Sequence, residues 1–497
     1  MFPRRILEAC TAILIGAGLV WASPARGQMR AAPDSATIEQ RIGNVTSRLL
    51  VESAVPGVYT TAGLRERMAH YHTPGISIAV VNDYRVEWAR GFGVREAGSP
   101  FPVDTDTRFQ AASVSKPTFA TVVMRLVEQG KISLDEDVNS YLTSWKVPPV
   151  GPWQPRLTLR QLLGHGAGLT VHGFLGYDAS GPIPTLLQVL DGVPPANSPP
   201  VRVNLLPGIQ SVYSGGGLVV AQLAVTDHVG RPLPELAQDL VFAPLGMRRS
   251  GYDQPLRDTI DVATGHYWMA LPLRGRWHIY PELAAAGLWT TPSDLARLGS
   301  SLQRALRGDS GEILGQASVR EMMTPQHLRG DPIGISFFLL GQGDSARFEH
   351  GGWNEGYLTD LVMYVQGGRG AVVMANSNEA GDLMSEIMRA IAQEYGWPGY
   401  IRRPLPTRAL AVALAMRYAG SYLMDDGSRA DVRSNGGTLE LNLSQAGYVP
   451  LAPTSDTTFS IPGLDADVTF RRSGGALRLV LSQNGVTVAG RRLARRP

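Results

Sequence analysis

The sequence predicts an α+β fold with a small all-β unit at its carboxyl end. Two hairpin signals, at 75–94 and 357–377, are mixed with helical apolar spacing that starts at Ser113, and no regular βαβ alternation connects them. Residues 407–497 alternate almost throughout in strand fashion. We therefore expect a mixed unit over 28–400, followed by the all-β unit.

The first strands and the first long helix follow from local patterns. Residues 75–94 contain two strand-like runs joined at the turn VNDY, which is typical of a β-hairpin. From Ser113 onward, apolar residues recur at helical spacing, and Gly130 marks the expected end of the helix. Because proline fits a helix only in its first turn, Pro117 places the start near Ser113.

Two later segments carry equally clear signals. Thr291 is expected to cap a helix that has Pro292 in its first position and Asp294 in its third, as in a capping box. Residues 357–377 are expected to form a second hairpin with glycines at its turn. An amphipathic helix should then follow and end near Tyr395.

A change of composition separates the two units. The stretch GWPGYIRRPLP at 396–406 is rich in proline, glycine and arginine, which is typical of a linker. After one short helical run, LAVALAMRY, four runs alternate as strands: TLELNLS, DVTFRRS, ALRLVLS and VTVAGRRL. We interpret 407–497 as a barrel-like all-β domain.

Residues 1–27 have the pattern of a secretory signal peptide. Arg4 and Arg5 precede a short apolar run, and small residues around Ala25 and Gly27 suit a cleavage site. The apolar run is shorter than the about 20 residues that a membrane span needs. We therefore expect cleavage, export to the periplasm or the medium, and no membrane span in the mature chain.

Composition excludes several classes of function. The 46 Lys and Arg residues almost balance the 43 Asp and Glu residues, for a net charge of +3, and no basic stripe points to nucleic acid. Cys10, the only cysteine of the sequence, lies in the predicted signal peptide. Disulfides, thiolate metal sites and cysteine nucleophiles are therefore not expected. We expect neither a metal nor a cofactor, and the sequence indicates no oligomeric state.

The motif Ser113-Val114-Ser115-Lys116 carries the strongest chemical signal. Ser113 and Lys116 lie three residues apart at a helix start and share one face, so the amine can reach the hydroxyl. A serine hydroxyl is a weak nucleophile until a base takes its proton, and a lysine among apolar residues can serve as that base. The motif alone is common and would also suit a helix cap with a surface lysine.

Two further elements give this motif its context. Tyr213-Ser214-Gly215 follows a turn, and His350-Gly351-Gly352 immediately precedes the hairpin at 357. In order and spacing, the three elements resemble those of the serine β-lactamase, penicillin-binding protein and esterase superfamily, in particular its class C-like branch. The resemblance implies a β-lactamase/transpeptidase-like domain, with an antiparallel sheet flanked by helices and an all-helical subdomain. It also implies a lipocalin-like C-terminal domain.

The resemblance implies roles for individual residues. Ser113 corresponds to the acylated nucleophile, Lys116 to its base, and Tyr213 to the group that carries the proton to the leaving group. The backbone N–H groups of Ser113 and Trp353 would form the oxyanion hole. Such donors are typically worth about 2.7 to 4 kcal/mol each in rate.

His350, Gly351, Gly352 and Gly215 match positions where the family binds substrate, with two departures. The second element of the family often ends in an asparagine that holds the acyl amide of the substrate, and Gly215 has no such side chain. The third element of β-lactamases is commonly Lys-Thr-Gly, whose cation helps to hold a substrate carboxylate. His350, with a reference pKa of about 6.5, is mostly neutral at neutral pH, and Gly351 has no hydroxyl.

We expect an exported serine hydrolase that forms an acyl-enzyme on Ser113, namely an esterase or a peptidase/amidase that acts on small acyl donors. One alternative is a β-lactamase or D-alanyl-D-alanine carboxypeptidase, and another is a non-catalytic penicillin-binding sensor. The aromatic residues of HGFLGYD at 172–178 suit an acyl pocket and core packing equally well.

Overall fold

The structure is a computed structural model. It describes residues 33–53, 57–327, 329–401, 410–425, 427–435, 437–443, 447–461, 466–483 and 486–493. The predicted signal peptide and part of the predicted linker lie outside these ranges. Among the helices of these ranges, none has the length and apolar character that crossing a bilayer requires.

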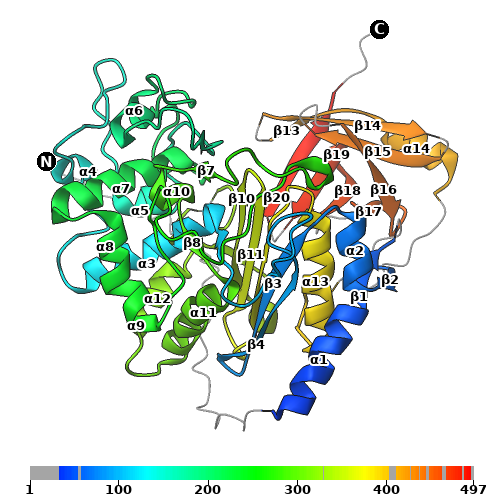
Figure 1. The fold of residues 1–497 in the computed structure, drawn as a ribbon. Helices are drawn as coiled ribbons and strands as arrows, with labels where there is room; N and C mark the ends of the chain where they lie inside the picture. Colours follow the sequence, from blue (N-terminus) through cyan, green and yellow to red (C-terminus); the bar gives the residue numbers. More distant parts are fainter. Residues whose placement is uncertain are drawn as a thin grey trace, which may run out of the picture.

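A six-stranded antiparallel sheet lies at the centre of the first unit (Figure 1). In spatial order its strands are β4 (Arg85–Gly93), β3 (Gly75–Asn82), β12 (Gly370–Ala375), β11 (Tyr357–Tyr364), β10 (Arg347–Asn354) and β9 (Phe338–Leu340). Both predicted hairpins are confirmed. Asp83 and Tyr84 turn the chain between β3 and β4, and Gly367 and Gly368 adopt positive φ angles between β11 and β12.

The two faces of this sheet are covered by different helices. Ile76, Ile78 and Val80 of β3 pack into one apolar cluster, while Ala79 and Val81 belong to a second cluster on the opposite face. The first face is covered by α1 (Ser35–Ser47), α2 (Leu64–His70) and α13 (Gly381–Glu394), and the second by α11 (Pro292–Arg307). Helix α13 confirms the predicted helix after the second hairpin.

Helix α11 begins at the predicted cap, but only half of the capping box forms. The hydroxyl of Thr291 accepts the N–H of Asp294 at 3.3 Å. The carboxylate of Asp294 does not return the bond, and instead accepts the N–H of Arg249 and the hydroxyl of Ser250, each at 2.9 Å. Aspartate is one methylene shorter than the glutamate of a full capping box, and its carboxylate ties a neighbouring loop to the helix instead.

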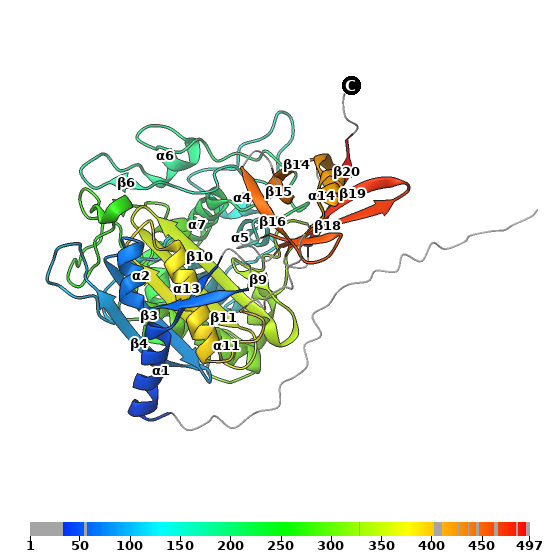
Figure 2. The same cartoon turned by 90° about the vertical axis from the view of Figure 1, so that its right-hand side faces the viewer.

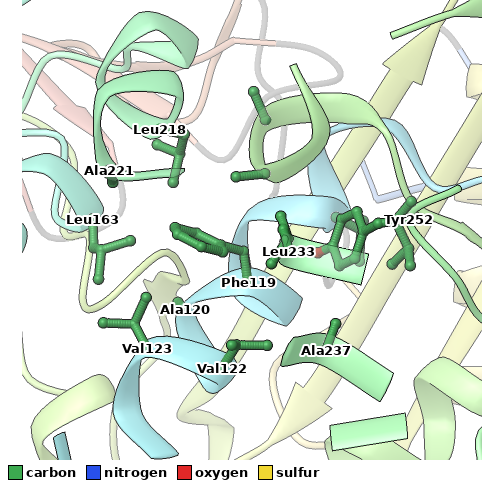
Figure 3. Packing of buried hydrophobic residues seen from close by; sticks show 14 of the residues in the cluster. Phe119, Ala120, Val122, Val123, Leu163, Leu218, Ala221, Leu233, Ala237 and Tyr252 are labelled. Atoms are coloured by element: carbon green, nitrogen blue, oxygen red, sulfur yellow. The ribbon is translucent and has the colours of Figure 1, made fainter. Parts of the chain in front are cut away.

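A helical layer packs beside the sheet around α3 (Ser115–Glu128) and α7 (Gly215–Val229). Phe119 of α3 is completely buried near Leu163, Leu218 and Leu233, which come from three other helices (Figure 3). The shorter helices are α4 (Val138–Tyr141), α5 (Leu159–Leu163), α6 (Leu186–Asp191), α8 (Leu233–Ala237), α9 (Ala243–Leu245), α10 (Leu283–Ala286) and α12 (Gln316–Met322). Three small two-stranded sheets pair β1 (Leu49–Glu52) with β2 (Tyr59–Ala62), β5 (Phe109–Gln110) with β8 (Trp289–Thr290), and β6 (Tyr177–Asp178) with β7 (His278–Ile279).

The C-terminal unit is a closed barrel of antiparallel strands with a separate apolar core (Figure 2). Its elements are α14 (Val412–Tyr418), β13 (Gly420–Met424), β14 (Arg429–Asn435), β15 (Thr438–Leu443), β16 (Tyr448–Pro453), β17 (Thr458–Ser460), β18 (Ala466–Ser473), β19 (Ala476–Gln483) and β20 (Val486–Arg492). The predicted all-β unit and the short helix before it are confirmed. Its likeness to a lipocalin stays a prediction.

Candidate active site

Ser113 and Lys116 lie together, as the spacing of the motif predicts. Ser113 belongs to a short 3-10 turn, Ala112–Val114, that leads into α3, and its side chain is partly exposed. The side chain of Lys116 is only 2% exposed, and its Nζ lies 2.8 Å from Ser113 Oγ. The same Nζ lies 2.8 Å from the carbonyl oxygen of Ala285. Both contacts of the amine are thus to uncharged oxygens.

The turn that presents Ser113 is strained and firmly held. Ala112 has a φ of 49°, a left-handed conformation that an alanine rarely adopts. Ser115, the other serine of the motif, donates to Ala112 O at 2.5 Å and accepts the N–H of Leu288 at 3.0 Å. The hydroxyl of Ser115 therefore fixes the turn, and Ser113 is the serine left to face Lys116.

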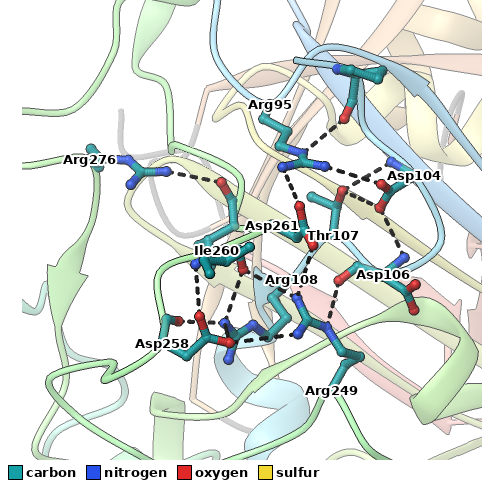
Figure 4. A network of polar contacts seen from close by, with 12 residues as sticks. Arg95, Asp104, Asp106, Thr107, Arg108, Arg249, Asp258, Ile260, Asp261 and Arg276 are labelled. Carbon is teal, nitrogen blue, oxygen red and sulfur yellow. Dashed lines mark hydrogen bonds and ion pairs between the residues drawn. The ribbon is translucent and has the colours of Figure 1, made fainter.

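An ion-pair network holds the strand that leads to this turn (Figure 4). Arg95 pairs with Asp261, and Arg108 pairs with Asp258, at 2.5 and 2.9 Å. The backbone N–H of Arg108 also donates to Asp261 O at 2.8 Å. Arg108 directly precedes β5, so these contacts fix the direction in which the chain approaches Ser113.

Helix α10 supplies carbonyl groups to two sides of the site. Ala285 O contacts Lys116, and Ala286 O accepts the side-chain amide of Asn354 at 3.1 Å. Asn354 also donates to Gln110 Oε1 at 2.8 Å, which joins β10 to β5. Gln222 of α7 accepts the N–H of Ala284 at 2.8 Å and so anchors the helix.

Tyr213 lies beside Lys116, with the amine 5.0 Å from the ring centroid. Its ring stacks on His165 with centroids 4.4 Å apart, and Phe338 lies on the Tyr213 ring at 6.0 Å. His165 Nδ1 accepts the N–H of Ser214 at 3.1 Å, and burial and the charge of Lys116 hold the pKa of His165 well below its ordinary value. A neutral His165 therefore orients Tyr213.

Strand β10 passes very close to Ser113. A β-carbon added to Gly352 would lie 2.3 Å from Ala111 O and 3.2 Å from the nitrogen of Ser113, so only glycine fits there. Asn354 closes a two-residue turn against Tyr357, and hydrogen-bonded pairs alternate along such a ladder. The N–H of Trp353 must then point away from β11, toward the edge that β9 leaves uncovered. The Trp353 residue is 52% exposed.

His350 is deeply buried in the site. Its side chain is 2% exposed, and Nδ1 lies 2.6 Å from Gly351 O, so this nitrogen carries the proton. Burial and the neighbouring charge of Lys116 lower the pKa of His350 to about 3. The imidazole is therefore neutral at neutral pH, as expected, and it titrates far below the reference value of about 6.5 because an imidazolium would lie in a dry site.

Gly215 begins α7, and the aromatic loop 172–178 packs against it. A β-carbon on Gly215 would lie 3.1 Å from both the Phe174 ring and His172 O. Phe174 and Tyr177 are buried among core residues, whereas Leu175 between them is 56% exposed. Core packing is thus the main role of these aromatic rings. Within the described ranges, no group of three or more His, Cys, Asp or Glu side chains could hold a metal ion.

Comparisons with known proteins agree with this arrangement. The Beta-lactamase family model matches residues 62–395. Penicillin-binding protein 4* of Bacillus subtilis is 24% identical over 452 residues, which cover 85% of this chain and 96% of that protein. Esterase EstB of Burkholderia gladioli is 32% identical over 176 residues, which cover 33% of this chain and 43% of the esterase.

A solved structure shows the same overall fold. The octameric penicillin-binding protein homologue from Pyrococcus abyssi superposes with a TM-score of 0.58 at 22% identity. The superposition covers 86% of this chain and 98% of that chain. The predicted β-lactamase/transpeptidase-like α+β fold is thereby confirmed.

Proposed function

The chain belongs to the Beta-lactamase family of serine hydrolases, and on this premise we propose that it is exported and forms an acyl-enzyme on Ser113. The proposed substrates are small esters or amides that carry no carboxylate near the scissile bond. The observation that carries the proposal is the 2.8 Å contact between Lys116 Nζ and Ser113 Oγ, made by a buried lysine. Within the described residues, no carboxylate pairs with this lysine.

The proposed reaction assigns one step to each of these groups. Lys116 takes the proton of Ser113 as Oγ attacks the acyl carbon. The N–H groups of Ser113 and Trp353 donate to the oxyanion that forms. Tyr213, beside the amine, passes a proton to the leaving group as its bond to the acyl carbon breaks. Water then releases the acyl group through the same steps.

The third sequence element supports a preference for uncharged substrates. Neutral His350 offers no cation where β-lactamases commonly have a lysine, and Gly351 offers no hydroxyl. Beside Gly215, the Phe174 ring occupies space that an asparagine side chain would need. A substrate carboxylate would therefore lose an ion pair, whereas a neutral ester would lose nothing.

A parallel turnover assay tests the proposal. The substrates are a short-chain nitrophenyl ester, a chromogenic cephalosporin and a D-Ala-D-Ala peptide, and Ser113→Ala is the control. We expect the ester to have the highest kcat/KM and Ser113→Ala to abolish its turnover. Faster turnover of the cephalosporin or the peptide would favour a β-lactamase or a carboxypeptidase. Labelling of Ser113 without turnover of any substrate would favour a sensor.

A further inference from the structure

Glu282 is a buried carboxyl group that the proposed reaction does not use. It directly precedes α10 in the chain, and its side chain is 0% exposed. Its Oε1 accepts the hydroxyl of Tyr177 at 3.3 Å, whereas its Oε2 has no hydrogen-bond partner among the described residues. An ionised carboxylate with one bare oxygen is costly in such a place, so the geometry favours the neutral acid.

The carboxyl group joins two supports of the active site. On one side lies α10, which gives Ala285 O to Lys116. On the other lies the 172–178 loop, in which His172 Nδ1 donates to Tyr213 O at 2.5 Å. Tyr177 is in this loop, and it links the loop to Glu282 through its hydroxyl. A displacement at Glu282 would therefore reach both Lys116 and Tyr213.

Among the described residues, none with a positive charge pairs with Glu282. Tyr177 and Tyr280 are the titratable groups beside it, and Glu355 interacts with Tyr280 through its backbone N–H at 3.3 Å. Lys116 contacts the backbone carbonyl of Ala285 in α10, and not the side chain of Glu282. Burial raises the pKa of Glu282 to about 7.

We propose that Glu282 is a positioning residue whose protonated side chain holds α10 and the 172–178 loop together, and thereby holds Lys116 and Tyr213 around Ser113. The proposal rests on the proposed function, since it concerns the reactivity of Ser113. When Glu282 loses its proton, a bare charge forms in a dry site. The two supports then separate to admit water, and Ser113 loses its base and relay geometry.

The test is the rate at which a fluorophosphonate labels Ser113 between pH 5.5 and 8.5. Glu282→Gln keeps an acceptor for Tyr177 and cannot ionise. The quantity compared is the labelling rate of the parent divided by that of this variant. We expect this ratio to be constant below pH 6. If Ser113 reacts only while Glu282 holds its proton, the ratio should fall by up to about thirtyfold at pH 8.5. Ester kcat should fall in parallel with little change in KM. Tyr177→Phe should slow labelling at pH 5.5, where Glu282 holds its proton.

Asp360→Asn is the matched control. Burial also raises the pKa of Asp360 to about 7, but this residue lies on β11 opposite Gly351, and its charged neighbours are Glu349 and Arg347. Its variant should keep the alkaline fall of the parent. A rate ratio for Glu282→Gln that does not change with pH, or an alkaline fall that Asp360→Asn removes, would overturn the proposal. Absence of labelling in the parent at every pH would instead contradict the acyl-enzyme itself.

Discussion

The buried acid at Glu282 makes the stability of the fold depend on pH in a defined direction. In the unfolded chain this carboxyl group ionises near its ordinary pKa of 4.5, whereas in the folded chain it keeps its proton up to about pH 7. Below pH 4.5 both states hold the proton, so the contribution to stability is fully present. As pH rises from 4.5 through the folded pKa the contribution is lost, because the unfolded chain gives up the proton while the folded chain still holds it.

The size of the effect follows from the two pKa values. Each tenfold change in proton affinity corresponds to 1.36 kcal/mol, so a rise from 4.5 to about 7 amounts to about 3 kcal/mol of unfolding free energy. Glu282→Gln has no proton to lose. Between pH 4.5 and 7.5, the variant should therefore gain about 3 kcal/mol relative to the parent, whatever fixed cost the amide brings.

Denaturant unfolding of both proteins at pH 4.5, 5.5, 6.5 and 7.5 measures this difference, with the denaturant midpoint as the readout. Comparing Glu282→Gln with the parent at the same pH cancels the contributions of all other titrating groups to the unfolding free energy, including that of Asp360. A difference between the parent and Glu282→Gln that stays constant over this range would contradict a raised pKa for Glu282. It would mean that the carboxyl group is ionised throughout, with a donor for Oε2 in solution.

Four further outcomes are expected. Lys116→Ala should slow fluorophosphonate labelling of Ser113 by about 10²- to 10⁴-fold, and unchanged labelling would remove the lysine from the reaction. Because the pKa of His350 is about 3, pH profiles for a carboxylate-bearing substrate and a neutral ester should run parallel from pH 5.5 to 8.5; an acid-side gain for the former alone would contradict the buried, neutral imidazole. Gly352→Ala places a methyl group 2.3 Å from a carbonyl oxygen and should lower ester kcat/KM by at least tenfold, whereas wild-type kinetics would show that β10 lies further away. N-terminal sequencing of exported protein should find a mature terminus between 26 and 29, and an intact Met1 would exclude cleavage.

The elements that could be predicted from the sequence are those set by interactions between residues close together in the chain. The hairpins at 75–94 and 357–377 follow from period-two alternation and their turns, and the Ser113–Lys116 contact follows from three-residue spacing on a helix. The carbonyl group of Ala285, which completes the lysine site, lies 169 residues from Lys116 in the chain. A backbone oxygen has no side-chain signature, so no pattern in the sequence could identify it.

The burial of His350 was equally invisible in the sequence. The residue type gives only the reference pKa of about 6.5 and says nothing of how deeply the ring lies. Tertiary packing decides otherwise, because Phe338 lies 5.3 Å from the imidazole and Tyr213 lies 6.1 Å away. The strained φ of Ala112 is another property that only the assembled site imposes on the chain.

The charges around Lys116 bear on the choice of substrate. Burial and the lysine together keep His165 and His350 neutral, so both imidazoles surround the amine without charge. A substrate carboxylate placed here would find its cation in protonated Lys116. A protonated lysine cannot accept the proton of Ser113. The state of the enzyme that binds a carboxylate most tightly would therefore be the state in which Ser113 is least reactive. A neutral acyl donor makes no such demand, and it leaves the amine free to act as the base.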